Sequence, residues 1–354
     1  MTVHAPLPQT GAGFVEHDER IQYFIKFDTT QNFGDYLPEL FCKALLLHPK
    51  VEADIFRLVG SVIDERWIRR DLRKAVGTPD GLMAFWGCGK RDVTPISAEV
   101  LDKCLFFGVR GPLTRDALGL PASTVLGDPG LLAPLLFQPE GEAGRSGRTI
   151  CVPHTHDTLS PAELLTLSGC DSLVSPVVDG SEAGLLGILQ QIWDASFVLT
   201  GSLHAAIIAF AYGRPFAFWD TGHVDAPFKW NDFATSVGLP DTFVGALAEG
   251  QALYRDVLEP ARRPLPLTPM LDVCPFQVRP SMLVKALAHD GRLDPAMAEA
   301  TATALASLPG EDLATVYDLQ SASRAHRAKR AGLSGQVVNA LSLRAQALKA
   351  KLKG

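Results

Sequence analysis

One histidine of this chain follows an apolar run and precedes a helical pattern. The segment TGSLHAAIIAFAYGRP (residues 200–215) places Ser202, Leu203 and His204 at this junction. Backbone N–H groups at a helix N-terminus are unpaired, so they bind phosphate or carboxylate groups. His204 is therefore a candidate to pass a proton to or from a substrate held there, because imidazole titrates near neutral pH. The alternative is a core histidine bonded to a carbonyl group, which the junction between strand and helix disfavours.

A second candidate site is the segment GVRGPLTRDAL, in which Arg110 precedes a Gly-Pro turn. Proline suits the first turn of a helix, so the turn fixes the direction in which Arg110 leaves the strand. A guanidinium binds two anionic oxygens at once, and Arg110 is expected to clamp a phosphorylated substrate. Arg115, one turn later, is expected to form a surface salt bridge instead.

Acidic residues end two other apolar runs. The sequence NFGD brings Asn32 and Gly34 before Asp35, which either caps the following helix or accepts protons from sugar hydroxyls. The sequence VLGDPG sets Asp128 before a proline, as in a turn or a cap, and we assign Asp128 to substrate binding.

Two further motifs lie at strand ends. Gly87 and Gly89 either let the backbone approach a ligand or turn the chain, and a lone G-x-G does not predict a dinucleotide site. In PHTHD, His154 and His156 precede Asp157, but no distant third ligand accompanies them, so we expect no metal. His154 is instead a candidate base.

Strand-turn-helix segments position these residues. Apolar runs that end in glycine-bearing turns begin at residues 21–27 and recur at 54–63, 81–90, 105–118 and 123–136. This alternation predicts an α/β fold with a mostly parallel sheet covered on both faces, and ligands of such sheets bind beyond the carboxyl ends of the strands. A helix is expected over residues 37–47, and further helices over 280–289 and 295–307.

The length of 354 residues favours two domains and a cleft between them. A polar, glycine-rich stretch marks the linker. The expected parts are an N-terminal extension (1–20), a first Rossmann-like domain (21–137), a linker (138–149), a second Rossmann-like domain (150–279) and a helical extension (280–354).

The composition excludes several classes of protein. The net charge of -6 gives no global attraction to nucleic acid, and the six cysteines form no C-x-x-C pair. The first 18 residues do not resemble a signal peptide, and no apolar run reaches the ~20 residues that span a bilayer, so we expect a cytoplasmic protein. Residues 324–354 carry eight Lys and Arg and no acid, which predicts either a basic helix at the inner face of the membrane or a solvated tail.

In order along residues 24–231, the motifs NFGD, VGS, WGCG, VRGPLTR, LGDP, PHTHD and GSLHAAIIAFAYGRP resemble the polysaccharide pyruvyl transferase family, in particular its ketal pyruvate transferases of bacterial exopolysaccharide synthesis. The resemblance implies two facing Rossmann-like domains of the glycosyltransferase-B type. It also implies phosphoenolpyruvate as the donor substrate, no cofactor, and a lipid-linked or polymeric saccharide as the acceptor.

The resemblance assigns roles residue by residue. His204 matches the family's proposed catalytic histidine, Arg110 its donor-binding arginine, and His154 the histidine of its P-H-x-x-D segment. The chain departs from the family at Ser202, where members often carry the arginine of an Arg-Leu-His motif. The candidates to replace that cation are Arg214, Lys90 and Lys229.

The implied reaction protonates the vinyl carbon of the donor, and two sugar hydroxyls then add while phosphate leaves, which closes a cyclic ketal. We expect His204 as the acid, Asp35 or His154 as the base, and Arg110 with the helix N-terminus at Ser202 as the phosphate clamp. Two alternatives are a nucleotide-sugar glycosyltransferase of the same architecture and a non-catalytic saccharide-binding or assembly protein. The missing arginine favours the second alternative.

Overall fold

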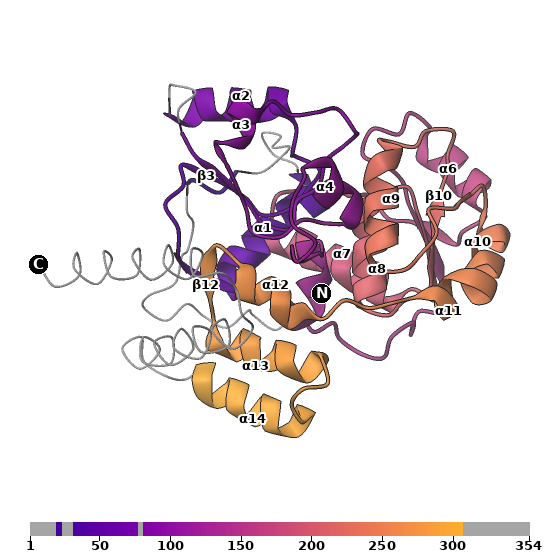
Figure 1. Cartoon of the computed structure of the whole chain (residues 1–354). Helices are drawn as coiled ribbons and strands as arrows, with labels where there is room; N and C mark the ends of the chain where they lie inside the picture. The colour runs from indigo at the N-terminus through magenta and orange to yellow at the C-terminus, as the bar shows by residue number, and fades with distance from the viewer. Residues whose placement is uncertain (1–18, 23–30, 77–80, 307–354) are drawn as a thin grey trace, which may run out of the picture.

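The first half of the chain folds around a three-stranded parallel sheet (Figure 1). The structure, a computed structural model, describes residues 19–22, 31–76 and 81–306. The sheet has the order β3 (Ile55–Arg57), β4 (Met83–Phe85), β5 (Cys104–Phe106). The helices of this half are α1 (Phe33–Ala44), α2 (Glu65–Val76), α3 (Ala98–Leu101), α4 (Pro112–Ala117), the 3-10 helix η1 (Pro129–Leu132) and α5 (Ala133–Leu136).

Side chains of this sheet alternate between two apolar clusters, as the two-residue period of a strand requires. Ile55, Met83 and Phe85 belong to a small cluster that includes the buried side of α2. Phe56 and Ala84 face the opposite way, into the main core. Both faces are therefore buried, which explains why these strands read as continuous apolar runs.

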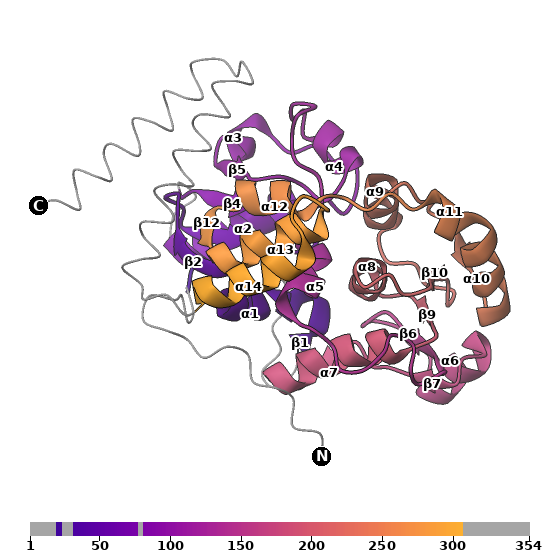
Figure 2. The same ribbon diagram turned by 90° about the horizontal axis from the view of Figure 1, so that it is seen from below.

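The second half contains a five-stranded parallel sheet with helices on both faces. Its strand order is β11 (Phe243–Val244), β10 (Phe216–Trp219), β9 (Phe197–Thr200), β6 (Thr149–Val152), β7 (Ser172–Leu173). Its helices are α6 (Pro161–Ser168), α7 (Glu182–Asp194), α8 (Leu203–Ala211), α9 (Pro227–Ser236) and α10 (Leu247–Leu253). Figure 2 shows α7, α8 and α9 on the face toward the first half, and α6 and α10 on the outer face. The expected α/β fold with parallel sheets is thus confirmed.

The connections of this sheet create a crevice between β6 and β9. The chain leaves β6 toward β7 and returns to β9 on the other side of β6, so the strand order reverses there. Ligands bind at such a switch point, beyond the carboxyl ends of the two strands. His154 follows β6 and Ser202 follows β9, so the fold brings these two candidates to one place.

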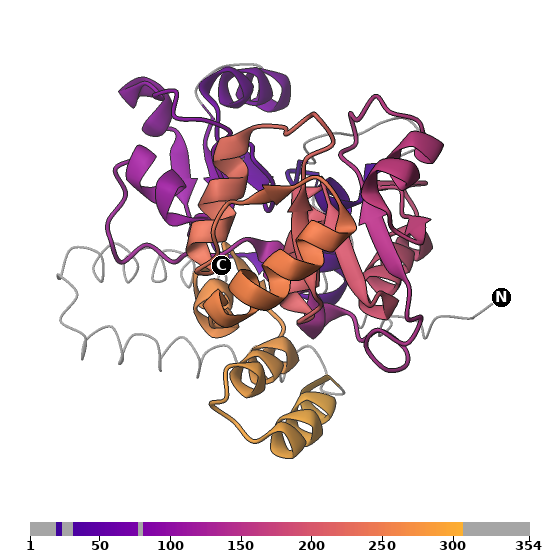
Figure 3. The ribbon, with the colours of Figure 1, turned by 90° about the vertical axis from the view of Figure 1, so that its right-hand side faces the viewer.

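Short antiparallel pairs join distant segments. β1 (Gln31–Asn32) pairs with β8 (Val177–Val178) of the second half, and β12 (Phe276–Val278) pairs with β2 (Leu46–Pro49) of the first. The last elements are a π-helix (Tyr254–Leu258), α11 (Glu259–Ala261), α12 (Leu267–Val273), α13 (Pro280–His289) and α14 (Pro295–Ala306). α13 packs on α14 and on α5, and Figure 3 shows α13 and α14 side by side at one end of the molecule. The chain therefore returns to the first half after the second sheet.

The predicted helix over 280–289 is confirmed as α13, and the one predicted over 295–307 is confirmed up to Ala306, the last described residue. The first helix begins and ends earlier than predicted. Asn32 starts it, because its side-chain oxygen accepts a hydrogen bond from the N–H of Gly34 at 3.1 Å. It ends at Ala44, and the apolar residues that follow enter β2 instead. Tertiary pairing with β12 has overridden the helical pattern there.

Residues 138–148 run through turns between α5 and β6, and the predicted domain boundaries stay a prediction. The N-terminal extension up to residue 18, most of the predicted strand at 21–27 and the basic tail lie outside the described residues. Within the described part, no helix is both long and apolar enough to cross a membrane.

The pairing of β12 with β2 predicts a loss of stability on truncation of Phe276. This side chain is fully buried, and its ring centroid lies 4.6 Å from that of Phe56. Phe276→Ala should lower the free energy of unfolding by about 3–5 kcal/mol, measured by chemical denaturation. The control Met297→Ala removes a side chain that is 59% exposed and should change it by less than about 0.5 kcal/mol. An equal effect of both variants would contradict the packing described.

Candidate functional site

A cavity of about 270 Å³ opens between the two halves at the carboxyl ends of their strands. The first half contributes Asn32, Asp35, Ser61, Trp67 and Arg91, and the second contributes His154, Thr155, His156, Ser202, Leu203, His204, Asp225 and Lys229. Its size suits a small ligand together with part of a larger one that enters from outside. The cavity therefore collects six of the eleven site residues predicted from the sequence.

The N-terminus of α8 forms part of the cavity wall. Ser202 is the N-cap residue, and its own N–H donates to Thr200 Oγ1 at 2.9 Å. Leu203 and His204 are the first two residues of the helix. Backbone N–H groups at such positions have no acceptor within the helix. Gly34 of α1 lies against the imidazole, because a Cβ atom at position 34 would clash with it. The predicted Gly34 thus supports His204 instead of lining the cavity itself.

His204 is held as a neutral imidazole. Burial, together with the positive charges of Lys229 and Arg110, lowers the pKa of His204 to about 3. Its Nε2 atom is buried and has no hydrogen-bond partner. An imidazole in this state accepts a proton more readily than it donates one, and an anion bound nearby would raise its pKa again.

The pKa of Asp35 is shifted in the opposite direction to that of His204. Asp35 lies in the first turn of α1, and the alternative that it caps this helix is wrong because Asn32 does so. Burial raises the pKa of Asp35 to about 7, against the opposing charges of Lys229 and Arg57. A carboxyl group with this pKa is partly protonated at neutral pH, so it can serve as an acid.

A hydrogen bond between Asn32 and Thr155, which both line the cavity, joins the two halves. The amide Nδ2 of Asn32 donates to Thr155 Oγ1 at 3.0 Å. The same asparagine caps α1 through its side-chain oxygen. Asn32 therefore fixes the start of α1, and with it Asp35, relative to the loop that follows β6.

Asp225 gathers three cationic or hydrogen-donating groups. Its Oδ2 lies 2.5 Å from Lys229 Nζ and 3.5 Å from His154 Nε2, and its Oδ1 lies 2.6 Å from Arg91 Nη2. Burial alone would raise the pKa of Asp225, but the hydrogen bond from His154 and the charge of Lys229 hold it well below its usual range. Burial lowers the pKa of Lys229, and Asp225 opposes this effect.

The tautomer of His154 follows from its neighbours. Its Nδ1 accepts a hydrogen bond from the N–H of His156 at 3.2 Å, so the proton of the neutral ring is on Nε2, which faces Asp225. Burial lowers the pKa of His154, although the hydrogen bond to Asp225 opposes this shift. Among the described residues, no group of three His, Cys, Asp or Glu side chains has the arrangement of a metal site.

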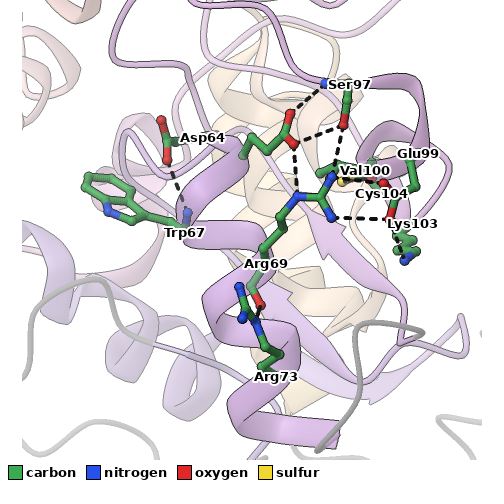
Figure 4. A network of polar contacts seen from close by, with 10 residues as sticks. Asp64, Trp67, Arg69, Arg73, Ser97, Glu99, Val100, Lys103 and Cys104 are labelled. Atoms are coloured by element: carbon green, nitrogen blue, oxygen red, sulfur yellow. Dashed lines mark hydrogen bonds and ion pairs between the residues drawn. The ribbon is translucent and has the colours of Figure 1, made fainter.

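Trp67 and Arg91 form the wall contributed by the first half. The guanidinium carbon of Arg91 lies 5.5 Å from the centre of the Trp67 ring. Figure 4 shows that Trp67 points away from the ion pairs that fix α2, in which Arg69 contacts Glu65 at 2.9 Å and Glu99 at 3.0 Å. These contacts hold α2 against α3 and so present an aromatic face to the cavity.

Arg110 does not line the cavity, and the phosphate clamp expected of it is not formed in the structure. Its guanidinium is fully buried and contacts Asp232 Oδ2 at 3.2 Å, Ser61 Oγ at 2.6 Å and the carbonyl oxygen of Lys90 at 2.9 Å. Asp232 also accepts from both the N–H and the hydroxyl of Thr114. Arg110 therefore joins the two halves and orients Ser61, which does reach the cavity.

Gly87, Gly89 and Asp128 also lie behind the cavity wall instead of lining it. Gly87 has a φ of +62°, and a Cβ atom there would meet Pro129, whereas one at Gly89 would meet the guanidinium of Arg110. Asp128 is fully buried and accepts from the N–H of Gly130 at 2.9 Å, as the cap signature predicts. Their assignment to substrate binding is not supported by this geometry.

Of the three candidates for the missing cation, Lys229 lies in the cavity wall. Lys90 donates to the carbonyl oxygen of Thr94 at 2.7 Å, and Arg214 to that of Ala195 at 2.9 Å, both away from the cavity. Arg91 and Asp225 line the cavity but are not among the residues predicted from the sequence. The signal was present, because each follows a strand, β4 or β10, by a few residues.

Two comparisons with known proteins find similarity to part of this chain. A family model described as polysaccharide pyruvyl transferase matches residues 54–220, which confirms the resemblance for that region. The chain is 28% identical over 131 residues to the succinoglycan biosynthesis protein ExoV of Rhizobium meliloti (strain 1021), and the alignment covers 37% of this chain and 40% of that protein. No solved structure matches the chain.

The burial of Arg110 predicts that its loss weakens the fold. Arg110→Ala leaves the fully buried Asp232 without its countercharge and should lower the free energy of unfolding by about 3–5 kcal/mol in denaturant titration. Asp232→Ala should act similarly, and the double variant should lose less than the sum of the two. Arg255→Ala, which breaks an exposed pair with Asp256, is the control and should leave stability unchanged. Strict additivity would contradict the direct contact.

Proposed function

We propose that this chain is a polysaccharide pyruvyl transferase that moves pyruvate from phosphoenolpyruvate onto a hexose of an exopolysaccharide, or of its lipid-linked precursor, and forms a cyclic ketal. The family match and the relative in succinoglycan biosynthesis support transfer to a polysaccharide. The observation that carries the proposal is the convergence of His204, Asp35 and two cations on one cavity at the strand ends. In this proposal the two parallel sheets correspond to the facing domains of a glycosyltransferase-B fold.

The charges of the cavity suit a small donor with a phosphate and a carboxylate. Arg91 and Lys229 supply positive charge from opposite halves, and the N-terminus of α8 adds unpaired N–H groups. An arginine grips two oxygens in a fixed plane, whereas a lysine acts as a point charge. The cavity thus offers at least two separate positions for oxyanions, as phosphoenolpyruvate requires.

The electrostatics favour an exchange of the catalytic roles expected from the sequence. Asp35, with a pKa of about 7, donates its proton to the methylene carbon of the donor. The adjacent carbon becomes an oxocarbenium centre, and an acceptor hydroxyl attacks it while His204 takes the hydroxyl proton. A second hydroxyl forms the second C–O bond as the bond to phosphate breaks. One hydroxyl proton replaces the proton that Asp35 gave, and the other leaves with inorganic phosphate.

His204 suits this role because it starts as a neutral base. The trianionic donor raises its pKa from the low value set by burial and by Lys229, toward the range in which proton transfer is efficient. The same anion also favours the protonated form of Asp35. Binding of the donor therefore prepares both groups at once.

The proposed reaction has a direct test. Incubation of the protein with phosphoenolpyruvate and a lipid-linked saccharide extract should add one pyruvyl ketal, seen by mass spectrometry as pyruvate minus water, and should release one phosphate. A UDP-sugar in place of phosphoenolpyruvate is the control and should give no product. Sugar transfer from the nucleotide would instead support a glycosyltransferase, and no product with either donor would support a binding protein.

Substitution of Asp35 and His204 tests whether each takes part in the reaction. Asp35→Asn and His204→Ala should each lower kcat by about 10²–10⁴-fold while the thermal unfolding temperature stays close to that of the wild type. Because Asp35 must be protonated, kcat/KM of the wild type should fall as the pH rises above about 7. A rate that instead rises through this range, after correction for the donor's own ionisation, would contradict Asp35 as the acid.

A further inference from the structure

Three groups of the cavity wall converge on one carboxylate of the protein. Arg91, Lys229 and His154 contact Asp225 at 2.6, 2.5 and 3.5 Å, from three different segments of the chain. The Lys229 side chain is only 9% exposed, and a cation buried to this degree needs a countercharge. Asp225 supplies it, but Asp225 belongs to a loop between β10 and α9 and lies at the cavity surface.

The backbone next to Asp225 is strained. Ala226 has a φ of +47°, and among the described residues no other side-chain-bearing residue has a positive φ. An L residue keeps this conformation only where its surroundings hold it, and such strain often marks segments that move in function. Here the three contacts of Asp225 and the first turn of α9, in which Lys229 N–H donates to the carbonyl oxygen of Ala226 at 2.9 Å, hold it.

We propose that Asp225 holds the position of the donor's anionic group until the donor binds, and that Arg91, Lys229 and His154 form the subsite for that group. This inference rests on the proposed function. A carboxylate presents two oxygens and a negative charge, as the carboxylate and the phosphate of phosphoenolpyruvate also do. The incoming oxyanion takes over the three contacts, and the Asp225 loop turns outward from the strained conformation at Ala226.

The exchange explains how the cations are placed without a donor. Burial lowers the pKa of Lys229, and Asp225 opposes that shift, as a bound anion would also do. Arg91 and Lys229 are thus already close together when an anion arrives. Every anion that enters must therefore compete with the Asp225 carboxylate for these contacts. Weakly charged ligands compete poorly, so the subsite discriminates against them.

Calorimetric titration of the full chain tests this competition. Phosphoenolpyruvate, inorganic phosphate and pyruvate are titrated separately, and the last two distinguish a phosphate subsite from a carboxylate subsite. Asp225→Asn should bind phosphoenolpyruvate about tenfold more tightly than the wild type, because one competing charge is gone. The same variant should tighten the binding of either phosphate or pyruvate, whichever uses the subsite. Arg91→Gln should weaken the binding of phosphoenolpyruvate by about tenfold.

Asp220→Asn is the matched control. It makes the same chemical change in the same loop, but Asp220 is exposed and its carboxylate accepts only from the N–H of Gly222 among the contacts described. Its affinity for all three ligands should equal that of the wild type. Unchanged or weaker binding by Asp225→Asn, with a normal thermal unfolding profile, would overturn the proposal.

A second variant keeps the test valid if Asp225→Asn folds poorly. Ala226→Gly removes the strain and leaves every charge in place, so the conformation that holds Asp225 inside becomes easier to keep. The variant should weaken the binding of phosphoenolpyruvate by about two- to threefold, since the strain no longer favours displacement of Asp225. An unchanged affinity would show that Asp225 is not displaced. Tight binding without any ketal product would refute the proposed function but leave the subsite standing, so the two failures are distinguishable.

Discussion

The site depends on pairing of charges across the seam between the two halves of the molecule. Arg110 and Arg91 both follow strands of the first sheet, and each meets a carboxylate beside or within α9 of the second half. The two pairs differ in their access to the cavity. Arg110 and Asp232 are fully buried and do not line the cavity. Ser61 accepts a further hydrogen bond from Arg110, and Thr114 donates two to Asp232, so this pair joins the two halves. A buried pair is stable only when its remaining hydrogen-bonding groups are satisfied in this way.

The pair of Arg91 and Asp225 uses the same helix for another purpose. It lies at the cavity surface, where another oxyanion can reach the arginine. The middle of α9 therefore fixes the halves relative to each other through Asp232, and its N-terminal end leaves a cation within reach of a ligand. The buried pair of Arg110 and Asp232 sets the distance between the two halves. Arg91 and Asp225 must span the same distance, so the geometry of the site depends on the buried pair.

Burial shifts the pKa values of Asp35 and His204, the two groups proposed to transfer protons, in opposite directions but with one result. It raises the pKa of Asp35 and lowers that of His204, and so favours the uncharged form of each. An uncharged acid beside an uncharged base is the arrangement that a reaction needs if it both gives and takes a proton near neutral pH. The cations nearby oppose the shift of Asp35 and strengthen that of His204.

Rules for strand ends were sufficient to predict part of this site from the sequence. His154 follows β6, and Ser202 and His204 follow β9, two neighbouring parallel strands that bring these positions together. The same rule placed Arg110 in the site, but in the structure Arg110 does not line the cavity and contacts Asp232, a partner 122 residues away that no local pattern identifies.

In the fold, too, the elements with a local sequence pattern could be predicted, whereas the pairings between distant segments could not. Strands buried on both faces are visible as apolar runs, and the helices after residue 280 begin at prolines. The pairings of β1 with β8 and of β12 with β2 join short segments from distant parts of the chain. Two to four residues carry no periodicity that could distinguish such a strand from a loop.

The serine at position 202 shows how a change in one residue redistributes a function. The family that the motifs resemble often has an arginine here, beside the catalytic histidine, where its planar group would both attract and orient an anion. In this chain Lys229 brings charge from α9, but an ammonium group has no preferred plane. Orientation must therefore come from other groups, namely the guanidinium of Arg91 and the backbone N–H groups that begin α8. Because Arg91 belongs to the first half, a donor bound as proposed would be oriented only when both halves are in place, and its geometry would then depend on the contact between Arg110 and Asp232.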